Sequence, residues 1–85
     1  AVAVSLFPTV TDGAFTLQLQ TAAAATFQID FIDQFGRMVM QRVVQAPEGN
    51  HQQNFSVASL AKGVYYVRVR RSTGEFVSTE RLIKQ

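Results

Sequence analysis

The feature that most constrains the fold is an alternation of apolar and polar residues with a period of two, which runs along almost the whole chain. In residues 14–19, for example, Phe15, Leu17 and Leu19 share one face, whereas Thr16 and Gln18 share the other. Such alternation is typical of a strand that is buried on one side only. Turn residues interrupt the pattern at short, regular intervals, as in a β-sandwich or β-barrel. We therefore expect an all-β chain with almost no helix.

The alternation and its interruptions predict seven strands. Residues 58–61 are expected to form a single helical or 3₁₀ turn, with Leu60 closing one end of the core. The alanine run at 22–25 has no capping residues and is too short to hold a helix, so we interpret it as a loop or the edge of a strand. The expected strands cover residues 2–7, 14–19, 26–32, 37–44, 51–57, 64–70 and 76–83.

The length of 85 residues leaves room for one hydrophobic core and no more. The chain has no cysteine, so packing must hold it together without disulfide bonds. Two small sheets packed face to face bury seven short strands better than one open sheet does. We predict a seven-stranded immunoglobulin-like Greek-key β-sandwich, with a closed barrel as the alternative. Residues 1–85 are expected to be a single domain, and the initial Ala1 favours a piece of a longer precursor.

Two turns have particularly clear chemistry. The first is Thr11-Asp12-Gly13, where Asp12 can bond its own backbone and Gly13 tolerates a positive φ. In the second, Asp33 is expected to start a type I turn, and Gly36 to take the left-handed position that closes a bulge.

The charges are few and nearly balanced, with a net charge of +2. Two arginines, Arg68 and Arg70, share one face of a strand, and this grouping superficially resembles a nucleic-acid platform. Its other members are Arg71, Arg81, Tyr65 and Tyr66. We favour a structural interpretation, in which these cations keep an edge strand from pairing with another sheet. Glu75 and Glu80 on the next strand then balance their charge. No apolar run reaches the roughly 18 residues of a membrane span. We therefore expect neither a nucleic-acid partner nor insertion into a membrane.

The residue combinations that perform catalysis are not found in the sequence. The chain has one histidine, His51, and no cysteine, so neither a nucleophile with a histidine base nor a multi-histidine metal site can be assembled. Asp30 and Asp33 fall on opposite faces of a strand pattern, which argues against a pair of catalytic carboxylates. We predict that the domain is not an enzyme and uses no cofactor or metal. Residue chemistry alone thus points to a binding or structural module.

Four motifs occur in order along the chain, followed by a basic tail at 81–85. They are the opening Leu-Phe-Pro-Thr-Val-Thr-Asp-Gly at 6–13, the Asp-Gln-Phe-Gly turn at 33–36, the segment at 49–55, and Leu-Ala-Lys-Gly-Val-Tyr at 60–65. Their order and spacing resemble the type A C-terminal sorting domain of the type IX secretion system of Bacteroidetes. Thr9 and Val10 depart from the Asn-Pro found in that family's opening.

The resemblance implies a Greek-key sandwich that is an export address rather than an enzyme. It implies two partners, the outer-membrane translocon of type IX secretion and a sortase-like peptidase that usually removes the domain. It also implies a location in the periplasm, in transit to the outer-membrane surface or the medium. The alternative is an ancillary carbohydrate-binding or spacer module of a surface protein. Exposed edge strands allow a homodimer.

We expect recognition to depend on the last hairpin, because edge strands and chain ends expose backbone and side chains. Lys84 is expected to supply an exposed charge, and its removal together with Gln85 to leave the fold intact. Period two separates Leu82 from Ile83, so one of the two should be buried. The candidate recognition residues are Gly63, Tyr65, Leu82, Ile83, Lys84 and Gln85.

Overall fold

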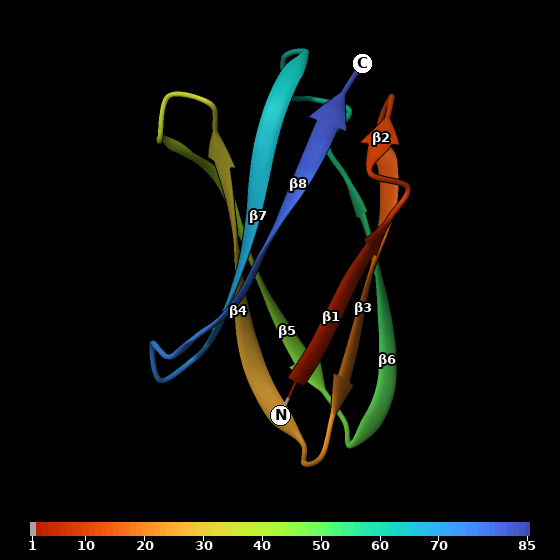
Figure 1. Ribbon diagram of the computed structural model, residues 1–85, viewed down its shortest axis with the longest axis vertical. Coiled ribbons are helices and arrows are strands. Elements are labelled where there is room, and N and C mark those ends of the chain that lie inside the picture. The colour runs from red at the N-terminus through yellow and green to blue at the C-terminus, as the bar shows by residue number, and fades with distance from the viewer. Residues whose placement is uncertain (1) are drawn as a thin grey trace.

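The computed structural model describes residues 2–85 as two β-sheets packed face to face, and Figure 1 shows their strands running along the long axis of the domain. The three-stranded sheet has the order β1 (Val2–Phe7), β3 (Ala14–Thr21), β6 (Gly49–Ser56). The five-stranded sheet has the order β2 (Val10–Thr11), β8 (Phe76–Lys84), β7 (Gly63–Arg71), β4 (Ala25–Asp33), β5 (Met38–Ala46).

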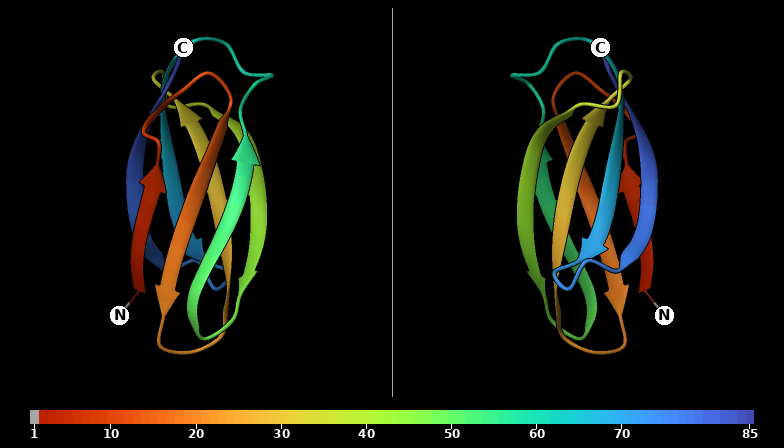
Figure 2. Two further views of the ribbon diagram at one scale, coloured as in Figure 1. Left: turned by 90° about the vertical axis from the view of Figure 1, so that its right-hand side faces the viewer. Right: turned by 90° about the vertical axis from the view of Figure 1, so that its left-hand side faces the viewer.

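The strand order confirms the immunoglobulin-like sandwich. The chain changes sheet at every connection except those between β4 and β5 and between β7 and β8, so strands that follow each other along the chain often belong to different layers (Figure 2). Within each sheet, neighbouring strands are antiparallel except for β2 and β8, which are parallel. The two sheets are not joined into a closed barrel. Residues 2–85 contain no helix.

The number of strands differs from the prediction, because the structure of residues 2–85 has eight rather than seven. The additional strand is β2, which lies after the cis Phe7–Pro8 peptide bond. Its residues pair with the last strand, Val10 with Ile83 and Thr11 with Lys84. A two-residue strand is too short to show alternation, so only this long-range pairing reveals it.

The core lies between the sheets and follows the predicted alternation. An aromatic cluster joins the layers: Phe15 of β3 stacks on Phe55 of β6 at 5.6 Å between ring centroids, and Phe31 of β4 meets both rings edge-on at 5.9 and 5.8 Å. Aromatic pairs of this kind contribute about 0.5–1.5 kcal/mol each beyond the area they bury. The buried apolar residues are Leu6, Phe15, Leu17, Leu19, Phe27, Ile29, Phe31, Val44, Ala46, Val57, Val67, Val69 and Leu82.

The connection between β6 and β7 contains the single turn expected at 58–61. The N–H of Leu60 donates to the C=O of Val57 at 2.9 Å, which closes one turn that does not develop into a helix. The Leu60 side chain is partly buried and packs against the core. The expected role of Leu60 at the end of the core is therefore confirmed.

The turn at Asp33 forms as predicted. Asp33 Oδ1 accepts the backbone N–H groups of Phe35 and Arg37, each at 2.9 Å, and Oδ2 accepts the Nε–H of Arg37 at 2.8 Å. Gly36 has a φ of +83°, the left-handed conformation that glycine adopts without a steric penalty. The backbone N–H of Arg37, more than any other group, lowers the pKa of Asp33. One carboxylate thus organises the whole β4–β5 turn.

The chain bends at Asp12 and Gly13 as predicted, but the Asp12 side chain does not hold the bend. The side-chain bonds of the bend come from Thr11, whose hydroxyl accepts the Gly13 N–H at 3.0 Å and donates to the Ala14 C=O at 2.6 Å, whereas Asp12 is exposed. Gly13 is buried and does not have a positive φ. A Cβ at Gly13 would lie 3.3 Å from the Cβ of Ala58, so close packing explains the glycine. The Thr11 hydroxyl thus makes the hydrogen bonds that we expected from the Asp12 carboxylate.

Replacing Asp33 by asparagine should reduce the pH dependence of stability. The pKa of Asp33 is lower in the folded state, so its carboxylate stabilises the fold above the ordinary aspartate pKa and loses that effect as the pH falls through the folded-state pKa. Urea unfolding should show a destabilisation by Asp33→Asn that is present at neutral pH and shrinks in acid.

The matched control is Asp12→Asn, which removes the same charge from an exposed side chain that does not hold its turn together. This control should change the free energy of unfolding little. An equal destabilisation by Asp33→Asn at neutral and acidic pH would contradict the role of the charge.

Candidate recognition site at the C-terminal end

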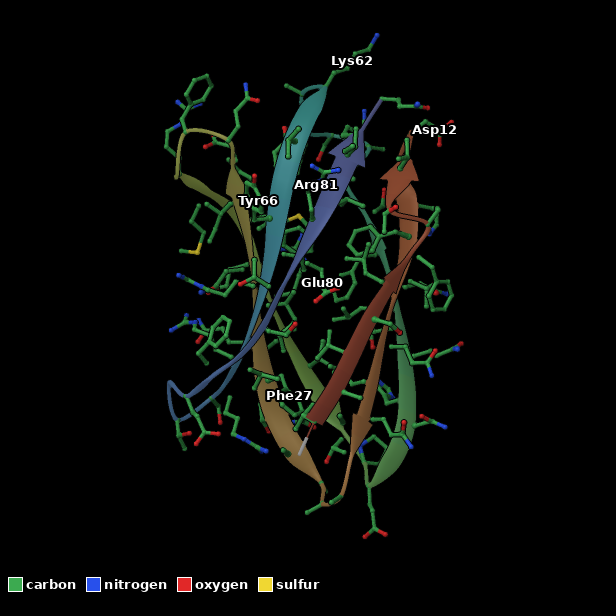
Figure 3. All side chains as sticks on the ribbon, viewed as in Figure 1. Asp12, Phe27, Lys62, Tyr66, Glu80 and Arg81 are labelled. Carbon is green, nitrogen blue, oxygen red and sulfur yellow. The ribbon has the colours of Figure 1, made fainter. Side chains whose placement is uncertain are left out.

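One end of the sandwich gathers the final residues of β8 and three connections. These are residues 8–13 between β1 and β3, residues 34–37 between β4 and β5, and residues 57–62 between β6 and β7. Figure 1 shows them at the top with the C label, and the N label at the opposite end. Asp12 and Lys62 mark this end in Figure 3. We call it the C-terminal end.

The last residues of the chain are held by hydrogen bonds on both sides. On one side Lys84 pairs with Gly63 of β7. On the other side the N–H of Ile83 donates to the C=O of Thr9, and the N–H of Gln85 donates to the C=O of Thr11, both at 2.8 Å. The expectation that the last hairpin leaves its backbone open at the chain end is therefore wrong, because β2 covers it. A partner that reads this segment in the folded domain must contact side chains.

The side chains of the last strand alternate between the core and the surface. Leu82 is fully buried, and Ile83 is partly exposed, which confirms that period two separates them. Lys84 is only 8% exposed, so the expectation of an exposed charge is wrong. Lys84 is two residues after Leu82 and shares its inward face, and its stem is buried while Nζ donates to the Gln85 backbone oxygen at 3.2 Å. Gln85 is exposed.

Gly63 and Tyr65 have clear structural roles. Gly63 opens β7 with a φ of +153°, which disfavours other residues even though nothing lies within 4 Å of a Cβ placed there. Tyr65 is 5% exposed, and its phenol O–H donates to the C=O of Ala61 at 2.5 Å. Tyr65 thus holds the β6–β7 connection against the end of the core.

A pocket of about 100 Å³ lies at the C-terminal end, between the β4–β5 turn and the β6–β7 connection. Asp33, Lys62 and Tyr65 contribute to its lining, together with Phe35, which is 74% exposed. The guanidinium of Arg37 sits 5.6 Å from the centroid of the Phe35 ring. The pocket has room for a side chain of a partner, beside an exposed aromatic ring.

Our sequence interpretation did not single out Phe35 or this pocket. A signal was available, because an aromatic residue in the middle of a hairpin turn gains nothing from exposure to water and is often used for contact. The pocket itself has no sequence signal, since it forms only where two connections distant in the chain meet.

The structure brings the six candidate recognition residues together: five lie on the adjacent strands β7 and β8, and Gln85 directly follows β8. Gly63 and Tyr65 lie on β7, paired with Lys84 and Leu82, and both predicted turns lie at the same end. Among residues 2–85 there is no cluster of histidine, cysteine, aspartate or glutamate suited to a metal ion. No helix in this described part of the chain could span a membrane.

Comparison with known protein families matches residues 5–85 to the secretion system C-terminal sorting domain. No curated protein matches the chain. The family match includes the β4–β5 turn, the pocket, the paired end of β8 and all six candidate recognition residues. The chain therefore belongs to the family of secretion system C-terminal sorting domains and is a sorting signal of the type IX secretion system.

Proposed function

We propose that residues 1–85 form one domain at the end of a longer exported precursor, and that the folded domain is the handle by which the precursor is exported. In this proposal the outer-membrane translocon binds the C-terminal end while the precursor is in the periplasm. A sortase-like peptidase then removes the domain as the cargo reaches the cell surface or the medium. The observation that carries the proposal is the double pairing of the last residues of β8.

The position of the two ends supports a handle that works with any cargo. The domain measures 35 Å along its longest axis, and Val2 and Gln85 lie toward opposite ends of that axis (Figure 1). A polypeptide attached ahead of Val2 would leave the domain at the end remote from the recognition residues. The C-terminal end therefore stays accessible whatever precedes the domain.

The six recognition residues divide into contact and positioning roles. Ile83 and Gln85 present side chains to solvent, and we infer that they contact the translocon. Leu82, Lys84 and Tyr65 are buried, so they act by fixing the strand and the neighbouring connection. Gly63 contributes a backbone conformation that side chains disfavour.

The family is one of sorting signals rather than enzymes. We infer that this domain performs no chemistry itself, and that any cleavage is carried out by the peptidase. The buried carboxylates support this inference, since Asp30 and Asp33 are each occupied by arginine side chains.

We also propose that two copies of the chain pair through β6. This strand is an edge of the three-stranded sheet, and its residues Gly49–Ser56 include no charged side chain and no proline. Charges and prolines are the usual devices that keep edge strands from pairing. By contrast, the edge strand β5 of the five-stranded sheet carries such a charge. Its Arg42 is paired with the core residue Ile29 and therefore lies on the inner face of the sheet.

An export assay tests the contact role of Ile83. The 85-residue chain is fused to a reporter with an ordinary signal peptide, in a bacterium that has a type IX system. Ile83→Asn should leave the reporter in the periplasm, because it changes a partly exposed side chain of the proposed contact without removing a backbone bond.

The matched control is Val43→Asn, which likewise replaces a β-branched apolar side chain by an amide, at a 68% exposed residue of β5. Its reporter should be exported normally. If Ile83→Asn is exported as well as the control, or if the unmodified domain leaves the reporter in the periplasm, the proposal fails.

Deleting Lys84 and Gln85 should destabilise the domain, contrary to the sequence-based expectation. The deletion removes a buried lysine stem and the hydrogen bond from Gln85 to Thr11, with an expected loss of about 1–3 kcal/mol in the free energy of unfolding. Lys84→Met keeps an apolar stem of similar length and should cost less than about 1 kcal/mol. Chemical denaturation measures both, and equal stability of the truncated and full chains would show that the paired tail contributes nothing.

Sedimentation of the chain at increasing concentration tests the pairing of β6. A reversible dimer is expected, and Gln52→Lys should weaken it by placing a charge on the open edge. Gln20→Lys adds the same charge to the same face on the central strand β3 and should leave the dimer intact. A monomer at every concentration, or an equal effect of the two substitutions, would exclude this interface.

A further inference from the structure

The outer face of the five-stranded sheet carries a carboxylate that is completely buried although it points away from the core. Asp30 of β4 is 0% exposed because neighbouring side chains cover it. Its Oδ2 accepts from Arg70 Nε at 2.8 Å and from Arg68 Nε at 3.1 Å, with Arg68 Nη2 in ion-pair contact at 3.0 Å, and its Oδ1 accepts from Gln41 Nε2 at 2.8 Å. One aspartate therefore holds two arginines side by side.

This arrangement corrects our interpretation of the arginines from sequence. They lie on β7, which is a central strand rather than an edge. Glu75 pairs instead with Arg71 at 3.2 Å. Glu80 is paired with the core residue Val67 and so lies on the inner face of the sheet. The counter-charge for the two outward arginines is Asp30.

The arginines are fixed in position but their hydrogen-bonding capacity is not used up. Burial raises the pKa of Asp30, and the hydrogen bonds from Gln41, Arg70 and Arg68 outweigh it, so that the pKa is lowered overall and the group stays a carboxylate. Arg70 binds it through Nε, and among the hydrogen bonds of the described residues none occupies its Nη1 or Nη2. The side chains of Arg68 and Arg70 remain 39% and 27% exposed.

Large apolar side chains flank these arginines on the same face. Phe76, 61% exposed, is the cross-strand partner of Arg70. Tyr66, 40% exposed, lies between Ile32 on β4 and Arg81 on β8. Figure 3 shows Tyr66 and Arg81 on these adjacent strands. Tyrosine, phenylalanine and arginine together are the residue types enriched at the centre of protein–protein interfaces.

The charge of this face defines the chemistry of its partner. The face carries three positive charges and one negative charge, so its net charge is +2, which equals that of the whole chain. The charged residues are Arg68, Arg70, Arg81 and Asp30. A planar guanidinium with two free nitrogens is suited to bind a carboxylate with two parallel hydrogen bonds. Lipid surfaces are usually bound by long, mobile basic side chains, whereas Arg68 and Arg70 are held in place.

We propose that the outer face of the five-stranded sheet, centred on Arg68, Arg70 and Arg81 with Tyr66 and Phe76, is a docking surface for an acidic polypeptide segment. Carboxylates of the segment bind the free guanidinium nitrogens, and its apolar side chains pack on the two rings. The proposal does not depend on recognition of the C-terminal end, because these side chains belong to the middle and opposite part of β7 and β8.

The test is a nuclear magnetic resonance titration of the 85-residue chain with a synthetic peptide of alternating glutamate and phenylalanine. Saturable shifts are expected at the amides of Tyr66 and Phe76 and at the Nε–H of Arg68 and Arg70. The same peptide with glutamine in place of glutamate should bind at least about tenfold more weakly, because it lacks the charge-assisted hydrogen bonds.

Arg81→Gln removes an exposed charge from the docking surface without touching Asp30, and should weaken binding about three- to tenfold. Arg42→Gln makes the same substitution at an exposed residue of the edge strand β5, on the opposite face of the sheet, and should leave the affinity unchanged. Equal weakening by both variants, shifts on another surface, no saturable shift, or shifts with phosphatidylglycerol vesicles but not with the acidic peptide would each overturn the proposal. Because the readout is binding alone, it is independent of any outcome of the export assay.

Discussion

The parallel pairing of β2 with β8 is the constraint on which the functional end of this domain depends. Without it, the last residues of β8 would form the open edge of a sheet, held only by β7. With it, the backbone of Ile83 and Gln85 is bonded to Thr9 and Thr11. The chain end is then a fixed part of the sandwich, and its exposed side chains have defined positions.

The same pairing explains why the family resemblance extends to both ends of the chain. Residues 9–11 near the start and residues 82–85 at the end form one structural unit at the C-terminal end. The β4–β5 turn, organised by Asp33, and the β6–β7 connection, held by Tyr65, complete it. Our proposal is that a sorting signal built in this way is read as a folded surface rather than as a linear tail.

Two aspartates and one hydroxyl illustrate what sequence can and cannot predict. The turn at Asp33 was predictable because its bonds are local: an aspartate and a glycine three residues apart specify the geometry. The pairs of Asp30 with Arg68 and Arg70 were not, because 38 and 40 residues separate the partners and only the strand order brings them together. At Thr11 the local chemistry was predicted for the wrong side chain, since hydroxyls and carboxylates serve the same turns.

The fold class followed from the alternation of residues, which depends only on which face of each strand is buried. The burial of Lys84 did not follow from the same pattern. Alternation assigns the residue to the inner face, but it does not say that a lysine at the end of a sheet buries its stem there. β2 was missed for a related reason, because a strand of two residues is too short to show a period of two. Only its pairing with β8 reveals it as a strand.

The measurement that tests this account most directly is amide hydrogen exchange at the end of the chain. If the tail is a doubly paired strand, the N–H groups of Ile83 and Gln85, which donate to Thr9 and Thr11, must be protected against exchange. We predict that Ile83 is protected to nearly the same degree as Val67 in the middle of the sheet, and Gln85 somewhat less. Exchange of both amides at the rate of an unfolded peptide would contradict the account, because the tail would then be a loose segment.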